Sequence, residues 1–121
     1  MQKIVNSLYN KFILYYLEVL VILSRIVNVL IFLITLIIYF SLGFSIWVFL
    51  LLILFPDISA IGFLVNERIG NSIYNVAHSY VTISIIFLFI FLFTKELFWF
   101  EFFLIWLTHI SMDRSLGYTL R

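Results

Sequence analysis

The sequence has 121 residues, of which 65% are hydrophobic and 11% are charged. Soluble globular domains carry about 25% charged residues, so this composition excludes a water-soluble domain and predicts a single-domain integral membrane protein. The absence of cysteine excludes disulfides, thiolate metal ligands and thiol nucleophiles. A net charge of +1 gives no basis for binding nucleic acid, so we expect the lipid bilayer to be the main partner.

Residues 1–24 form the first predicted element. Polar residues recur in it at steps of three, four and seven, namely Lys3, Ser7, Asn10, Lys11 and Glu18. This spacing predicts an amphipathic helix at the membrane interface, which bends near Ser24–Arg25 into a first span. The alternative is one helix over residues 12–40, about 43 Å long, which would exceed a bilayer core of about 30 Å.

Residues 25–121 contain four apolar segments, which predict four transmembrane helices in an antiparallel bundle. Their approximate bounds are 26–42, 45–64, 72–93 and 98–118. Pro56, inside the second segment, frees a backbone carbonyl that a neighbour must bind. Both termini would lie on one side together with most lysines and arginines, and the positive-inside rule places that side in the cytoplasm.

Ionisable side chains lie inside these apolar segments, where they are costly, and they are therefore candidate functional residues. Asp57 lies about seven residues before the end of its span, His78 about seven after the start of the next, and His109 about nine before the end of the last. In spans of alternating direction, these positions share a depth of roughly 10–14 Å below the cytoplasmic surface. Asp113 lies one turn from His109 on the same helix face. We therefore expect all four side chains to meet in one buried pocket.

Two imidazoles and two carboxylates make a possible four-ligand site for one divalent ion of zinc, iron or manganese. A metal held by fewer than four of them keeps an open position and can activate water. Without a metal, Asp57 or Asp113 can orient a histidine as a general base. Five more polar residues are predicted to support the site or bind a substrate: Arg25, Asn28, Ser59, Asn75 and Arg114.

Three functions are compatible with this pattern. The first is a metal-dependent hydrolase or related enzyme that acts on a lipid or headgroup at the cytoplasmic leaflet, with Asp57, His78, His109 and Asp113 as ligands or acid–base groups. The second is a non-catalytic bundle or homo-oligomeric module, in which the polar cluster only fixes helix packing. The third is a small proton or solute conductor, which would need several copies because four helices enclose only a narrow path.

Three motifs occur in order near the proposed site. They are Phe55-Pro56-Asp57-Ile58-Ser59, then Tyr74-Asn75-Val76-Ala77-His78, and finally His109-Ile110 with Asp113-Arg114-Ser115-Leu116-Gly117-Tyr118. These motifs resemble those of the bacterial membrane proteins grouped as domain of unknown function 4260, and the resemblance covers about residues 25–121. The resemblance implies a small four-helix protein of the bacterial cytoplasmic membrane and names no reaction. Val27 and Asn28 occupy the place where the family pattern leads us to expect an acid, so no carboxylate from the first span is expected in the site.

Overall fold

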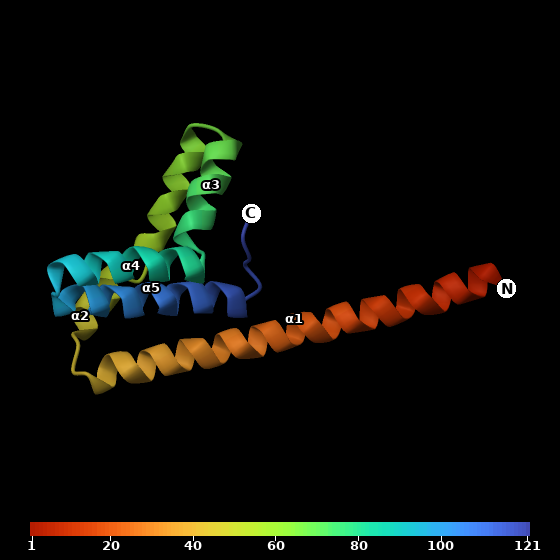
Figure 1. The fold of residues 1–121 in the computed structure, drawn as a ribbon, viewed down its shortest axis with the longest axis horizontal. Helices are drawn as coiled ribbons and strands as arrows, with labels where there is room; N and C mark the ends of the chain where they lie inside the picture. The colour runs from red at the N-terminus through yellow and green to blue at the C-terminus, as the bar shows by residue number, and fades with distance from the viewer.

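The computed structural model describes all 121 residues, which form helices and no strands (Figure 1). The elements in chain order are α1 (Gln2–Ser41), α2 (Ile46–Leu52), the 3₁₀ helix η1 (Phe55–Leu64), α3 (Glu67–Ala77), α4 (Tyr80–Thr94) and α5 (Leu97–Ser115). The predicted all-helical class is confirmed. Only the last predicted span, 98–118, coincides closely with one helix, α5; the first is part of a longer helix, and the second and third are divided.

α1 is one unbroken helix of 40 residues, about 60 Å long at 1.5 Å per residue. The expected bend near Ser24–Arg25 is absent, because residues 2–41 contain no proline or glycine that would kink the helix. The C-terminal part of α1 packs against α5, and Thr108 donates a 2.8 Å hydrogen bond to Thr35 there. The N-terminal part extends beyond the other helices (Figure 1). An interfacial position for residues 1–24 stays a prediction.

The predicted second span, residues 45–64, consists of two helices. α2 ends at Leu52, and Pro56 lies four residues later in the first turn of η1. A proline ring clashes with the carbonyl four residues earlier and provides no N–H, which explains why the α-helix stops there. Taken together, Ile46–Leu64 is still long and apolar enough to cross a membrane.

The predicted third span, residues 72–93, is also divided, since α3 and α4 meet at an angle of 65°. Ser79 caps α4 by accepting a hydrogen bond from the N–H of Thr82. Asn66 caps α3 by accepting one from the N–H of Ile69, so most of the segment 66–71, between the second and third predicted spans, is helical. As a result, η1 and α3 pack together as an arm that projects from the layer of α4 and α5 (Figure 1).

Membrane-spanning character is supported for part of the fold. α1 and the α2–η1 segment are long and apolar enough to cross a membrane, and the bent α3–α4 pair would make a third span. α5 is not among these candidates, because it carries Glu101, Asp113 and Arg114. Only 17 of 121 residues are buried, and the exposed apolar side chains suit a hydrocarbon surrounding better than water. A bundle of four spans therefore stays a prediction.

α5 is the central helix of the packed region. Its buried residues are Phe102, Leu104, Ile105, Thr108, His109, Ile110 and Ser111. They contact α1 and α2 on one side and α4 on another. Because α5 is held from several directions, the polar side chains near its C-terminal end have a fixed position relative to the arm of η1 and α3.

Candidate metal centre

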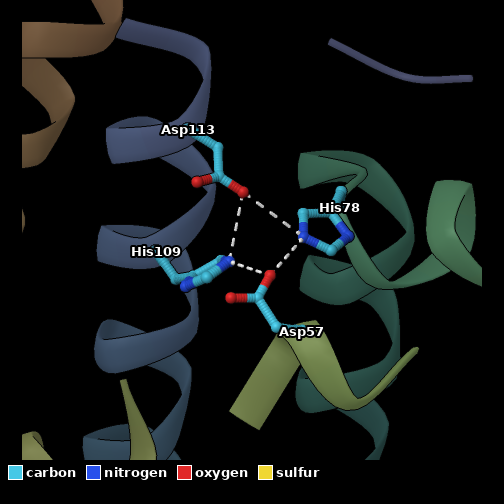
Figure 2. A group of neighbouring side chains, drawn as sticks. All are labelled: Asp57, His78, His109 and Asp113. Atoms are coloured by element: carbon cyan, nitrogen blue, oxygen red, sulfur yellow. Dashed lines mark ion pairs between the residues drawn. The ribbon is translucent and has the colours of Figure 1, made fainter. Parts of the chain in front are cut away.

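Four ionisable side chains converge where η1, α5 and the junction of α3 and α4 meet (Figure 2). Asp57 comes from the first turn of η1, and His78 follows the last residue of α3. His109 and Asp113 lie one turn apart on α5. One possible ligand atom of each residue lies within 4.8 Å of all the others. The convergence expected from the sequence is thus confirmed, whereas the roles of the four residues stay predictions.

The four atoms have the spacing of ligands around one ion. His109 Nε2 is 3.2 Å from Asp57 Oδ1 and 3.2 Å from Asp113 Oδ2. His78 Nε2 is 3.7 Å and 3.4 Å from the same two oxygens. A regular tetrahedron with metal–ligand distances of about 2.0–2.1 Å has edges of about 3.3–3.4 Å. The four nitrogen–oxygen separations lie close to this value, and all six separations lie within 4.8 Å.

The ring of His109 is oriented by the backbone break at Pro56. Its Nδ1 atom is 2.7 Å from the carbonyl oxygen of Ile53. That oxygen is available because Pro56 has no N–H to donate to it, while the N–H of Asp57 binds the carbonyl of Leu54. A carbonyl only accepts, so Nδ1 carries the proton and Nε2 of the neutral ring has a free lone pair. His109 is therefore the neighbour that the freed carbonyl requires.

The ring of His78 is oriented in the same way. Its Nδ1 atom is 3.0 Å from the carbonyl oxygen of Tyr74, and the Tyr74 ring stacks on the imidazole with centroids 3.9 Å apart. Trp106 Nε1 donates to the Ala77 carbonyl at 2.7 Å, and Arg114 Nη2 donates to the His78 carbonyl at 3.1 Å. These two bonds hold the junction of α3 and α4 against α5. Both histidines consequently present Nε2 to the carboxylates.

Both Nε2 atoms are buried and make no hydrogen bond. The side chains of His109 and His78 are 1% and 4% exposed, whereas those of Asp113 and Asp57 are 18% and 54% exposed. Buried polar atoms in folded proteins seldom lack a partner. Two such atoms that face two carboxylate oxygens therefore point to a shared cation. The cluster is most accessible on the side of Asp57.

The family model of a domain of unknown function (DUF4260) matches residues 21–121. The chain belongs to the DUF4260 family. The matched region contains all four side chains of the cluster and begins inside α1. No curated protein and no solved structure matches the chain. The resemblance indicated by the three sequence motifs is confirmed, and the family assigns no reaction.

Two of the five predicted supporting residues connect the cluster to α1 in this DUF4260 chain. Asn28 accepts a 2.6 Å hydrogen bond from the hydroxyl of Tyr80, the first residue of α4. The guanidinium of Arg114 lies over the Tyr80 ring, 4.6 Å from its centroid, and binds the His78 carbonyl. Asn28 and Arg114 thus support the backbone that carries His78. Neither hydrogen-bonds to an imidazole or carboxylate of the cluster.

The other three predicted supporting residues form no hydrogen bond with the ligand atoms of the cluster. The guanidinium of Arg25 packs against Gly117, where a Cβ atom would be 2.6 Å from Arg25 Nη2. Asn75 accepts a 2.7 Å hydrogen bond from the N–H of Arg121. Ser59 Oγ is buried without a partner, and the residue lines an apolar groove. The sequence placed these residues near the site, but the structure gives them no contact with its ligand atoms.

Three residues that shape the site were not predicted: Tyr74, Tyr80 and Trp106. Tyr74 lies four residues before His78, so helical spacing could have identified it. The contacts of Tyr80 and Trp106 span 52 and 29 residues of sequence, respectively. No local pattern reveals contacts of that range.

Proposed function

We propose that Asp57, His78, His109 and Asp113 form a membrane-embedded, metal-dependent hydrolase site, in which His78, His109 and Asp113 hold one divalent ion and Asp57 faces it from the exposed side. The observation that carries this proposal is the pair of buried, unpartnered Nε2 atoms at 3.2–3.7 Å from two carboxylate oxygens. Each imidazole also binds a backbone carbonyl through Nδ1. Metal-binding histidines usually have their second nitrogen oriented in this way.

The charges in the cluster also favour a cation. Asp57 and Asp113 bring two carboxylate oxygens within 4.8 Å of each other, and like charges at this distance repel. The two imidazoles are the only basic groups within 4.0 Å of either carboxylate, so no lysine or arginine compensates them. A divalent ion between the carboxylates would neutralise both charges and give the two Nε2 atoms a partner.

The donor set restricts the choice of metal. Two nitrogen and two oxygen atoms without sulfur suit zinc, iron or manganese. Zinc binds histidine nitrogen and aspartate oxygen at about 2.0–2.2 Å, which fits nitrogen–oxygen separations of 3.2–3.7 Å. Zinc is therefore the first metal to test.

The four residues differ in exposure, and this difference suggests different roles. His78, His109 and Asp113 are the less exposed residues and would hold the ion. A bound divalent metal activates water and polarises carbonyl or phosphoryl oxygens. Asp57, which is 54% exposed, can leave its position at the ion free for water and accept a proton from it.

The proposed substrate is a lipid or a lipid headgroup at the cytoplasmic surface of a bacterial membrane. Exposed apolar helices support a position inside the bilayer. Arg114 and Arg25, which form no ion pair with a carboxylate, provide positive charge for an anionic group. The excess of lysine and arginine near the termini and at the start of α3 supports a cytoplasmic orientation of both termini.

A structural metal site without catalysis is the second candidate. Four protein ligands make a closed site, which is typical of structural rather than catalytic zinc. The cluster also lies at two breaks of the backbone, one caused by Pro56 and one between α3 and α4. An ion bound there would fix both breaks.

Elemental analysis of the full-length protein, purified without chelators, tests metal binding. We expect one ion per chain in the wild type and less than about a tenth of that in His78→Ala and His109→Ala, because each removes a ligand. Glu101→Gln is the matched control, since it removes another carboxylate from α5 that binds Tyr39 instead. A wild-type protein without stoichiometric metal after exposure to zinc, iron and manganese would refute the proposal.

Asp57→Ala separates the two candidates. In the hydrolase, the three less exposed ligands keep the ion, and the metal content stays close to that of the wild type. In a closed structural site, the loss of the fourth ligand weakens metal binding at least about tenfold and lowers stability with it. Metal titrations of the two proteins measure this difference.

A further inference from the structure

A groove of about 620 Å³ lies between η1, α3, α4 and α5, and 14 of its 17 lining residues are hydrophobic. We name it the apolar groove. Buried Ala77, Phe87 and Phe102 form part of its wall, and partly exposed Ile58, Val76 and Ile86 are at its edges. Its volume lies within the range of about 300–1,000 Å³ that is typical of ligand pockets.

The apolar groove and the candidate metal centre are built from the same elements. Pro56 and Ala77 line the groove, and each directly precedes a residue of the cluster, Asp57 and His78. Trp106 also lines the groove and lies three residues before His109 on α5. Every element that contributes to the cluster therefore also forms part of the groove wall. The four cluster side chains do not line the groove, so a ligand in it would lie against their chain neighbours Pro56 and Ala77.

The polar groups near the groove are few and specific. Ser59 lines it with a buried hydroxyl that has no hydrogen-bond partner. The indole N–H of Trp106 is already bound to the Ala77 carbonyl. The hydroxyl of Ser59 is thus available to a polar atom on an otherwise apolar ligand.

We propose that the apolar groove binds one hydrocarbon chain of an anionic membrane lipid and places the polar end of that lipid at the metal centre. The inference rests on the proposed hydrolase and names its substrate class. The groove matches a chain in polarity, and Ser59 can donate to an ester oxygen close to it. Arg114 binds the His78 carbonyl beside the cluster and has no carboxylate partner, so the charge favours an anionic headgroup.

Native mass spectrometry of the detergent-solubilised full-length protein tests this inference, with palmitoyl lysophosphatidylglycerol as the probe. Ile86→Trp fills the groove, whereas Ile85→Trp adds the same bulk at the adjacent position of α4, which is 51% exposed and outside the groove. We expect the wild type and Ile85→Trp to bind one probe molecule, and Ile86→Trp to bind it at least about tenfold more weakly. Ser59→Ala should weaken binding about fivefold, the effect of one hydrogen bond.

Equal affinity of Ile85→Trp and Ile86→Trp for the probe would overturn the assignment. A dimer of the wild type that Ile86→Trp dissociates would also overturn it, because the groove would then hold a second copy of the chain. Val76→Trp, on the wall formed by α3, replaces Ile86→Trp if that variant loses its helical circular dichroism.

Metal content measured on the same samples separates this inference from the proposed function. If the wild type holds no metal but Ile86→Trp still weakens binding of the probe, the hydrolase is refuted and the lipid site is not. If the protein holds one metal per chain but Ile86→Trp binds the probe as well as Ile85→Trp does, the lipid site is refuted and the hydrolase is not.

Discussion

Replacing His109 with asparagine or alanine separates its contribution to metal binding from its contribution to the fold. The side chain is 1% exposed, Nδ1 binds the Ile53 carbonyl at 2.7 Å, and Nε2 faces Asp57 and Asp113. The amide nitrogen of asparagine lies close to where Nδ1 does, so His109→Asn can keep the bond to Ile53 while it removes Nε2. His109→Ala loses both. We therefore expect neither variant to bind the ion.

The expected difference in stability follows from the Ile53 carbonyl. A buried acceptor without a partner costs about 1–3 kcal/mol, so His109→Asn should exceed His109→Ala in free energy of unfolding by about this amount when metal is removed with a chelator. The wild type should gain about 2.7 kcal/mol more at a free metal concentration of 100 times the dissociation constant. Denaturant unfolding in detergent, followed by circular dichroism with and without zinc, measures both. Equal stability of the two variants would contradict the role of the Ile53 bond, and stoichiometric metal in His109→Asn would contradict Nε2 as a ligand.

Two further predictions concern the carboxylates and the break at Pro56. Asp113→Asn should weaken zinc binding more than Asp57→Asn, because Asp113 is less exposed and its oxygen is closer to His78 Nε2, at 3.4 Å against 3.7 Å. Isothermal titration measures both zinc affinities. A larger loss of affinity in Asp57→Asn would contradict Asp113 as the stronger ligand. Pro56→Ala should restore an N–H that competes for the Ile53 carbonyl and should lower zinc affinity at least about tenfold. Unchanged zinc affinity in Pro56→Ala would show that His109 does not depend on this break.

The position of the cluster could be predicted because it depends on the spacing of residues within one helix and on their distances from the ends of the apolar segments. His109 and Asp113 are four residues apart in one helix, and the distances of Asp57 and His78 from the ends of their apolar segments are similar. The freed carbonyl at Pro56 was also predictable, since it follows from the chemistry of proline. The partner of that carbonyl was not, because His109 lies 56 residues away.

The course of the helices around the cluster was predicted less well. Residues 72–93 contain no proline or glycine, so the break at His78–Ser79 has no strong local signal, and the serine cap of α4 is its only mark. The polar residues of the first 24 positions suggested a separate helix, whereas the lack of a helix breaker lets α1 continue to Ser41. The apolar groove needs four elements to meet and could not be derived from any single segment.

X-ray absorption at the zinc K-edge on the zinc-loaded wild type tests the central claim most directly. The account predicts one zinc per chain with a first shell of two imidazole nitrogens and one or two carboxylate oxygens at about 2.0–2.2 Å. His78→Ala and His109→Ala should each remove one of the two imidazole contributions or the metal itself. A shell of oxygen atoms alone, or a spectrum that both variants leave unchanged, would contradict a metal centre built from Asp57, His78, His109 and Asp113.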